Sequence, residues 1–513
     1  MAFPNRHIAL LRPEAALSRP KAAQSRLGAA LSRPKAALSR LGAALSRPKA
    51  AQSRLGAALS LLAAAIAAIV AMAALGACKK FVQVSPPAGQ SSTAEVFSSD
   101  ASATAAMNGV YSQMMGTNYS FADAAITLYV GMSADELYNT SPNPPVDQFT
   151  QNTLTAGNLL LLNNFWGDAY NYLYQVNAIL EGLSTSPAIS APVRAQLTGE
   201  ASCVRAFCYL YLSGLFGKVP LETGTNYTTN AVQPRTSMDS IYAQIVSDLQ
   251  TAQVLLQPAY PTAGPLRPNR WTAAALLARV YLYQGNWAGA ANESNRVIDS
   301  GNYKLDSPNQ VFLAYSAEAI WQMAPVVPGL NTFEGNDFIP TDSGQIPAYA
   351  ITPSLLAAFE PGDLRKTAWL GHNTIAGQVF YYPYKYKIQT GNANVENYMV
   401  LRLSEQYLIL AEALAQLGNV PGGQRYLNLI RTRAGLDTLS LSVPSDLIAA
   451  VLKERRVELF AEWGQRWFDL RRSGTVSSVL SPLKPSWRVT DTLYPIPLSQ
   501  LQANTFLTQN PGY

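Results

Sequence analysis

Cysteine and histidine are scarce, since the 513 residues contain only three cysteines and two histidines. His7 lies near the N-terminus, so His372 has no second histidine nearby in the chain to complete a zinc site or to activate a nucleophile. Cys203 and Cys208 fall in one predicted helix, where five residues separate their Cα atoms by roughly 8–9 Å, too far for a disulfide. We expect two free, buried thiols, and we expect neither a metal nor a cofactor.

Catalytic motifs are also absent, because the chain has no HExxH, GxSxG, P-loop or Rossmann glycine pattern. Glycoside hydrolysis needs two carboxylates roughly 5–10 Å apart across the substrate. Asp135 and Glu136 are adjacent in sequence, so their side chains are expected to point apart as a helix cap or as surface acids. The sequence therefore predicts a protein that is not an enzyme, with a surface glycoside hydrolase as the less favoured alternative.

The N-terminal segment 1–57 is repetitive and basic. The 14-residue unit ALSRPKAAQSRLGA occurs at 16–29 and again at 44–57, with a near copy between them. It has almost no bulky apolar residues and so cannot form a core, which predicts disorder or a translation start further downstream. Residues 1–77 hold 11 of the 38 Lys and Arg residues and one of the 32 Asp and Glu residues. The rest of the chain therefore has 27 basic and 31 acidic residues, which gives it a net charge of −4. The overall positive charge of the chain therefore gives no support to nucleic-acid binding.

Residues 58–77 have the pattern of a bacterial lipoprotein signal peptide. The segment 61–74 is apolar, and positively charged residues precede it. Leu75, Gly76 and Ala77 stand directly before Cys78 and resemble a lipobox. We therefore predict that Cys78 is lipidated and begins the mature protein.

Helical periodicity dominates the remainder. Segments near 98–114, 163–183, 194–215 and 237–256 predict amphipathic helices, with Ser98, Ser99 or Asp100 as the first cap. Two later segments each place a Gly-Asn turn, at 285–286 and 418–419, between two amphipathic helices, in the manner of tetratricopeptide repeats. A long loop-rich insertion with a short strand pair near 377–392 separates them. The predicted fold is mainly α, with tetratricopeptide-like helix pairs and minor short β-strands.

The segment 447–474 predicts one long C-terminal helix with an aromatic stripe that includes Trp463 and Trp467. We expect the stripe to be core. Glu462 and Arg466 are spaced to pair on its solvent side, beside Glu458 and Asp469.

Loop aromatics are the candidates for a ligand site, because a sugar ring stacks on an exposed aromatic face edged by amides or acids. Pro142, Pro144 and Pro145 indicate a loop in the segment 138–149, and Gly, Pro, Asn and Asp do so in the segment 326–349. We predict that the two segments converge into one shallow binding site. Its candidate ligand-binding residues are Tyr138, Asn139, Phe149, Asn336, Phe338 and Tyr349.

Several segments together resemble the SusD/RagB family. These are the lipobox with CKKF, EAIWQM, TPSLLAAFEPGDLRK, RYLNLIRTRAGL, KERRVELFAEWGQRWFDLRRSG and the closing YPIPLSQLQANTFLTQNPGY. The resemblance covers nearly all of 78–513, with an N-terminal part of about 78–230 and a tetratricopeptide-like and C-terminal part of about 231–513.

The resemblance implies a lipoprotein on the outer membrane that binds oligosaccharides and delivers them to a SusC-like TonB-dependent transporter. A peptide-binding protein of the RagB type is the alternative.

Overall fold

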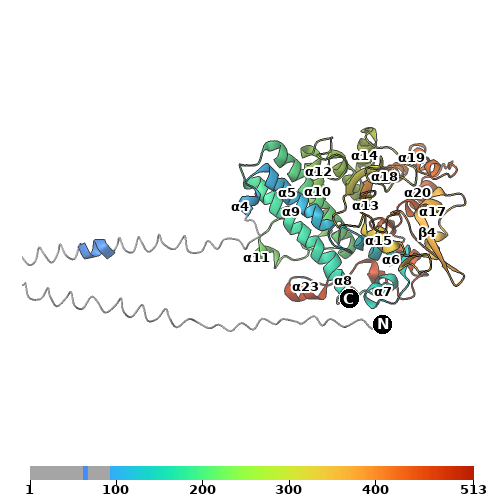
Figure 1. Cartoon of the computed structure of the whole chain (residues 1–513), viewed down its shortest axis with the longest axis horizontal. Coiled ribbons are helices and arrows are strands. Elements are labelled where there is room, and N and C mark those ends of the chain that lie inside the picture. The colour runs from blue at the N-terminus through green and yellow to red at the C-terminus, as the bar shows by residue number, and fades with distance from the viewer. Residues whose placement is uncertain (1–61, 68–92) are drawn as a thin grey trace, which may run out of the picture. The chain divides into compact units, whose positions relative to one another are not determined.

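The computed structural model describes residues 62–67 and 93–513, and the repeats and Cys78 lie outside these residues. Residues 62–67, in the predicted signal peptide, are helical, and residues 93–513 form one compact unit (Figure 1). No helix among the described residues combines the length and the apolar character that a membrane span needs.

The compact unit is mainly helical, as predicted. Its helices are α4 (Thr93–Val96), α5 (Asp100–Met114), η1 (Ile126–Val130), α6 (Gly131–Ser133), α7 (Pro144–Gln151), α8 (Leu159–Leu161), η2 (Leu162–Gly167), α9 (Asp168–Thr185), α10 (Ala191–Phe216), α11 (Tyr227–Asn230), α12 (Met238–Leu255), α13 (Arg270–Gln284), α14 (Trp287–Asp299), α15 (Phe333–Phe338), α16 (Pro353–Leu356), α17 (Leu364–Trp369), α18 (Leu403–Gln416), α19 (Val420–Arg433), α20 (Pro444–Glu458), α21 (Gln465–Arg472), α22 (Val476–Leu480), η3 (Val489–Thr492) and α23 (Leu498–Ala503).

Within residues 93–513, six short strands form three antiparallel pairs. They are β1 (Leu137–Asn139) with β3 (Tyr349–Ile351), β2 (Ala319–Met323) with β6 (Tyr398–Arg402), and β4 (Leu370–Ile375) with β5 (Gln378–Pro383). A strand pair was predicted within 377–392, but β5 instead pairs back onto the preceding segment. The turn at Ala376 and Gly377, both with positive φ, joins them.

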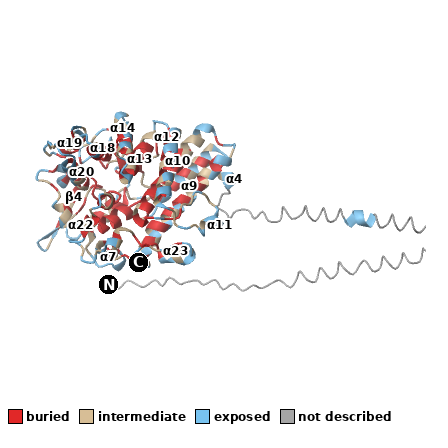
Figure 2. Cartoon of the chain, turned by 180° about the vertical axis from the view of Figure 1, so that it is seen from behind, coloured by how far each residue is buried: buried red, intermediate tan, exposed pale blue. Residues whose placement is uncertain are grey.

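The N-terminal helices follow the sequence patterns. Ser99 caps α5 by accepting from the backbone N–H of Ser102, and Gly217, with φ of 71°, ends α10. Helices α9 and α12 pack on either side of α10, which is buried along most of its second half (Figure 2). Cys203 and Cys208 are free and buried there, as expected.

Two helix pairs carry the predicted Gly-Asn turns. Gly285 adopts a left-handed φ of 70° after α13, and Asn286 caps α14. Gly418, with φ of 81°, and the capping Asn419 do the same between α18 and α19. The two pairs are in contact through α14 and α18, although a long insertion separates them in sequence. The description of these pairs as tetratricopeptide-like stays a prediction.

The predicted single C-terminal helix is wrong, because the chain breaks between α20 and α21. Ala461, Trp463 and Gly464 have φ values of 48°, 52° and 63° there. Glu462 therefore does not pair with Arg466 on a helix surface. It is buried and bonds to Lys385 and Arg402, whereas Arg466 pairs with Asp135.

A buried ionic network surrounds this break. Arg402 contacts Glu458 at 2.5 Å and Glu462 at 2.8 Å, and Arg365 reaches Glu458 at 2.9 Å. Arg433 joins Glu458 as well. Burial alone would raise the pKa of Glu458, but the guanidinium groups of Arg433, Arg402 and Arg365 hold it well below its usual range. The polar residues that seemed to be solvating in the sequence are thus charges inside the core.

Candidate ligand-binding site

The two predicted loop segments meet, as expected, through the β1–β3 pair. Tyr138 lies opposite Ala350 and Asn139 opposite Tyr349 in this ladder. Beyond the ladder, the backbone N–H of Thr140 donates to the carbonyl of Ala348 at 3.0 Å. Segments that lie about 200 residues apart in sequence therefore form one surface. Its role in ligand binding remains a prediction.

Segment 138–149 is more regular than predicted. Pro144 and Pro145 do not prevent a helix, because they occupy the first turn of α7, where a missing backbone N–H costs nothing. Phe149 therefore lies on a helix and is fully buried, with its ring stacked on Tyr129 at 4.9 Å between centroids. In this conformation its ring cannot contact a ligand.

The amide of Asn139 is also occupied. It donates to the carbonyl of Ser141 and to Asp147, and its oxygen accepts from Thr150 at 3.0 Å. Asn139 thus fastens β1 to α7 and is not free to bind.

In the second segment, Phe338 is 4% exposed at the end of α15 and packs edge-on against Tyr349, with 6.4 Å between ring centroids. Asn336 and Tyr349 are half-buried. Phe338 therefore supports Tyr349 from behind, and Tyr349 presents the accessible ring.

Tyr119 is a site residue that the sequence patterns did not single out, and the same is true of its neighbours Asn118 and Asp337. The hydroxyl of Tyr119 lies 3.2 Å from the hydroxyl of Tyr349, and its ring packs against Tyr129, with 5.7 Å between centroids. Phe149 stacks behind Tyr129, so three rings back one another. Tyr119 has a φ of 58°, and strained backbone of this kind is concentrated at functional sites. The available sequence signal for a loop at this point was the Gly-Thr-Asn tripeptide between α5 and Tyr119.

A polar group borders the two tyrosines. Asn118 donates through Nδ2 to Oδ1 of Asp337 at 3.1 Å. The second carboxylate oxygen of Asp337 and the amide oxygen of Asn118 are buried and lack a hydrogen-bond partner in the described part of the chain. Burial raises the pKa of Asp337 to about 6, although hydrogen bonds from Asn118 and Tyr119 oppose the shift. Both oxygens are enclosed by protein atoms, so they belong to the interior beneath the two tyrosines and not to the accessible surface.

The adjacent pair Asp135 and Glu136 is not on the surface, so that prediction is wrong. Asp135 is 2% exposed and is held by Arg456 at 2.6 Å and Arg466 at 2.8 Å. Glu136 is 1% exposed, and burial raises its pKa to about 8. Neither carboxylate can reach a glycosidic bond in this structure. Within the described ranges, no cluster of three or more His, Cys, Asp or Glu side chains could hold a metal ion.

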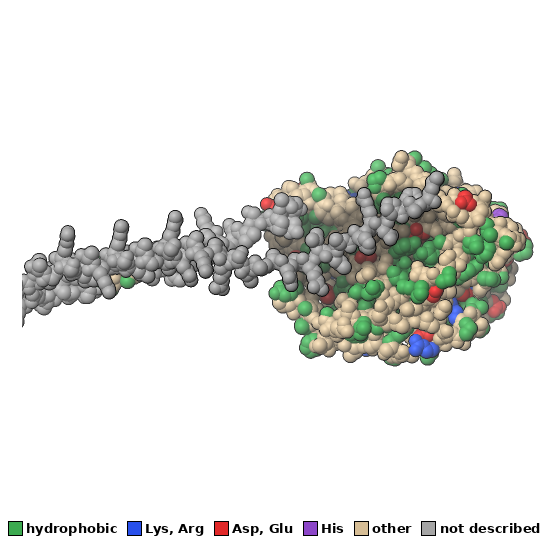
Figure 3. Space-filling view, turned by 60° about the horizontal axis from the view of Figure 1, so that its bottom comes forward, with side chains coloured by type: hydrophobic (Ala, Val, Ile, Leu, Met, Phe, Trp, Pro, Cys, Tyr) green, Lys and Arg blue, Asp and Glu red, His purple; other side chains and the backbone are tan. Residues whose placement is uncertain are grey.

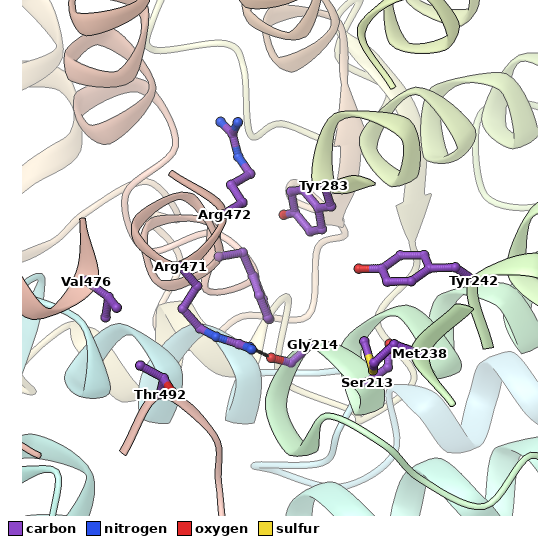
Figure 4. Close-up of a pocket in the computed structure, with 10 residues that line it drawn as sticks. Ser213, Gly214, Met238, Tyr242, Tyr283, Arg471, Arg472, Val476 and Thr492 are labelled. Carbon is purple, nitrogen blue, oxygen red and sulfur yellow. Dashed lines mark hydrogen bonds between the residues drawn. The ribbon is translucent and has the colours of Figure 1, made fainter. Parts of the chain in front are cut away.

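A cavity of about 320 Å³ lies elsewhere, between α10, α12, α13 and α21 (Figure 4). Arg471 points toward the carbonyl of Gly214 and donates to it, near the C-terminus of α10. Arg472 points the opposite way and pairs with Glu412 and Asp469. Both arginines therefore have structural roles. Tyr242 and Tyr283, which are half-buried like Tyr119 and Tyr349, also line this cavity.

Comparison with known proteins adds independent information. Residues 371–482 match the model of the SusD family, and residues 80–282 match a family model described as "Starch-binding associating with outer membrane". A SusD-like protein of Formosa agariphila is 25% identical over 521 residues, an alignment that covers 85% of this chain and 96% of that protein. A SusD-like protein of Bacteroides ovatus is 23% identical over 460 residues, covering 78% and 81%.

Solved structures show the same fold. A SusD superfamily protein from Bacteroides vulgatus superposes with a TM-score of 0.72 at 20% identity, covering 81% of this chain and all of that one. A laminarin-binding SusD-like protein superposes with a TM-score of 0.68 at 24% identity, with the same coverage.

Proposed function

Because this chain belongs to the SusD/RagB family, we propose that it is a lipid-anchored outer-membrane protein that binds oligosaccharides and passes them to a TonB-dependent transporter. The binding site in this proposal is the surface around Tyr119 and Tyr349. A family whose model is described by starch binding supports a binding protein and not an enzyme.

The arrangement of Tyr119 and Tyr349 carries the proposal. Both rings are half-buried, so each keeps one face or edge accessible while buried aromatic rings fix it from behind. A saccharide presents apolar C–H faces bordered by hydroxyl groups. The two rings can stack on such a face.

Neutral glycans are the ligand class that we favour. The comparisons include a protein whose name states laminarin binding and a family model named for starch binding, and both glycans are uncharged. On the visible surface of Figure 3, charged side chains are few and scattered among polar and apolar ones. At the Tyr119 surface itself, the bordering charged group is the acid Asp337, which gives no electrostatic preference for an acidic ligand.

Delivery and anchoring complete the proposal. The lipobox before Cys78 supports a lipid anchor, and the description of the matched family supports association with the outer membrane. A SusC-like transporter is the partner that the family resemblance implies.

The test is binding of purified protein to laminarihexaose and maltohexaose by isothermal titration calorimetry. We expect dissociation constants of micromolar order or weaker, roughly −8 kcal/mol at best, because stacking on exposed rings is modest. Tyr119→Ala and Tyr349→Ala should each weaken binding about tenfold, the effect of one lost aromatic contact. Tyr315→Ala is the matched control, since Tyr315 is 51% exposed and lies outside the site.

Three outcomes would count against the proposal. Equal loss of affinity in Tyr315→Ala and Tyr349→Ala would remove the site assignment. Binding to a peptide library with no binding to any glycan would favour the RagB-type alternative. Release of shortened sugars by the purified protein would show hydrolysis.

A further inference from the structure

A groove of about 440 Å³ lies between η2, α9, α11 and α23. The lining of this groove includes neither Tyr119 nor Tyr349, and in Figure 1 α11 lies at the left end of the compact unit while α15 lies to the right of its centre. The groove is lined mainly by apolar surface, and among the described residues no lysine or arginine lines it.

Four aromatic side chains give the groove a floor and a rim. Trp166, 3% exposed, and Tyr170 form the floor, with 5.0 Å between ring centroids. Tyr170 is fixed because its hydroxyl donates to the carbonyl of Pro220 at 2.8 Å. At the rim, Tyr174 is 53% exposed and Tyr227 is 78% exposed. Two largely accessible phenol rings therefore stand beside a rigid aromatic floor.

Glu222 adds an unpaired acid to this groove. Its backbone carbonyl accepts from Asn177 and Tyr209, but its carboxylate has no hydrogen-bond or ion-pair partner in the described part of the chain. Burial raises the pKa of Glu222 to about 7. Half-buried carboxyl groups are normally paired, so a free one in a groove is available to a ligand.

We propose that this groove is a second saccharide-binding site, in which Tyr174 and Tyr227 stack on a sugar ring and the Glu222 carboxyl hydrogen-bonds to its hydroxyls. The proposal deepens the proposed function, because it adds a second contact region for the same class of ligand.

The lining selects a neutral saccharide over other small ligands. An anionic group would meet Glu222 and no cation. A purely apolar ligand would leave the Glu222 carboxyl buried without a partner, which is costly. A sugar satisfies both features, since its hydroxyls can donate to the carboxyl while its C–H face covers the tyrosine rings. The side-chain N–H groups of Asn230 and Asn504 donate to the carbonyls of Gly224 and Gln233, so Glu222 and the amide of Gln500 are the polar groups on offer.

Hydroxyl-radical footprinting of the purified chain tests this site directly. Oxidation of Tyr174 and Tyr227 is measured by mass spectrometry with and without laminarihexaose and maltohexaose. We expect at least one of the two sugars to protect both tyrosines about twofold or more, while Tyr315, exposed elsewhere, stays unchanged. Glu222→Gln keeps the shape of the side chain, and Tyr227→Ala removes the rim ring.

The variants separate this site from the first. In the Tyr119→Ala, Tyr349→Ala double variant, protection of Tyr174 and Tyr227 should remain, and adding Glu222→Gln should reduce it. Protection that disappears with the double variant alone, or that is absent with both sugars, overturns the second site. Protection at Tyr119 and Tyr349 without protection at Tyr227 would leave the proposed function standing while removing this proposal.

Discussion

Trp463 and Trp467 allow a sharp test of the core, because they differ in one hydrogen bond. Both are buried, at 2% and 0% exposure. The indole N–H of Trp463 donates to the carbonyl of Met399 at 2.7 Å, whereas the indole N–H of Trp467 has no partner within the described residues. Replacing each by phenylalanine removes a similar apolar area, but only Trp463→Phe leaves a buried carbonyl without its donor.

The magnitudes follow from these contacts. Trp463→Ala and Trp467→Ala should each lower the free energy of unfolding by about 3–5 kcal/mol through loss of packing. Trp463→Phe should be more destabilising than Trp467→Phe by about 1–3 kcal/mol, the cost of an unsatisfied buried acceptor. Trp467→Phe also removes an unpaired N–H, which offsets part of its packing loss.

Urea unfolding followed by circular dichroism measures both differences without relying on tryptophan emission. Calorimetry with the best oligosaccharide should show unchanged affinity for the Phe variants, because neither indole lines the Tyr119 surface. A larger loss for Trp467→Phe than for Trp463→Phe would refute the hydrogen-bond assignment. Unchanged stability with collapsed affinity would refute the structural role of both residues.

Four further changes probe other features of the chain. Arg402→Met should lower the free energy of unfolding in urea by about 3–5 kcal/mol, because it leaves buried glutamates without their main cation; a loss below 1 kcal/mol would contradict this. Asp337→Asn should be more stabilising at pH 7 than at pH 4. Folding raises the pKa of Asp337 from 3.8 to about 6, so the contribution of this group to wild-type stability is complete below pH 3.8 and is lost as the pH rises to about 6. Urea midpoints that shift equally at pH 4 and pH 7 would argue against this. Gly182→Ala would place Cβ 2.1 Å from the ring of Phe97 and should lower the free energy of unfolding by about 1–3 kcal/mol. The matched Gly109→Ala meets no atom within 4 Å and should raise the free energy of unfolding by about 0.5–1 kcal/mol in the same assay. Cys78→Ala should yield a folded protein that leaves the membrane fraction, and unchanged fractionation and lipid labelling would disprove lipidation there.

Local patterns predicted the helices well because their signals are local. Ser99, the Gly-Asn turns and Gly217 each act within a few residues of the helix end that they define. The apolar face of α12 was also predicted, and Ile241, Ile245 and Leu249 are fully buried.

The C-terminal segment was misread because its polar residues have distant partners. Glu458 and Glu462 have the spacing of a solvated helix face, yet they are 0% and 8% exposed. Their cations, which are Lys385, Arg402, Arg433 and Arg365, lie 25 to 93 residues away. Nothing in the local pattern of 447–474 shows that they are close in space.

The candidate site was predicted at the level of segments but not of side chains. Strand pairing brought 138–149 and 326–349 together, and Tyr349 is accessible. Phe149 and Phe338 turned out to be the buried supports, because an apolar ring in a short irregular segment is pulled toward the core. Tyr119 joins the site only through tertiary contacts, so its neighbours in sequence gave little indication.

The buried ionic network constrains how this sequence can diverge. A single substitution at Arg402 or Glu458 strands the opposite charge in the core, whereas simultaneous replacement of several members by apolar residues can be nearly neutral. Gradual change, one codon at a time, must therefore pass through unstable intermediates. The match to the SusD family model at 371–482 spans Lys385, Arg402, Arg433, Glu458 and Glu462. Single substitutions in this part of the interior should therefore be poorly tolerated, because each leaves a buried charge without part of its partner set.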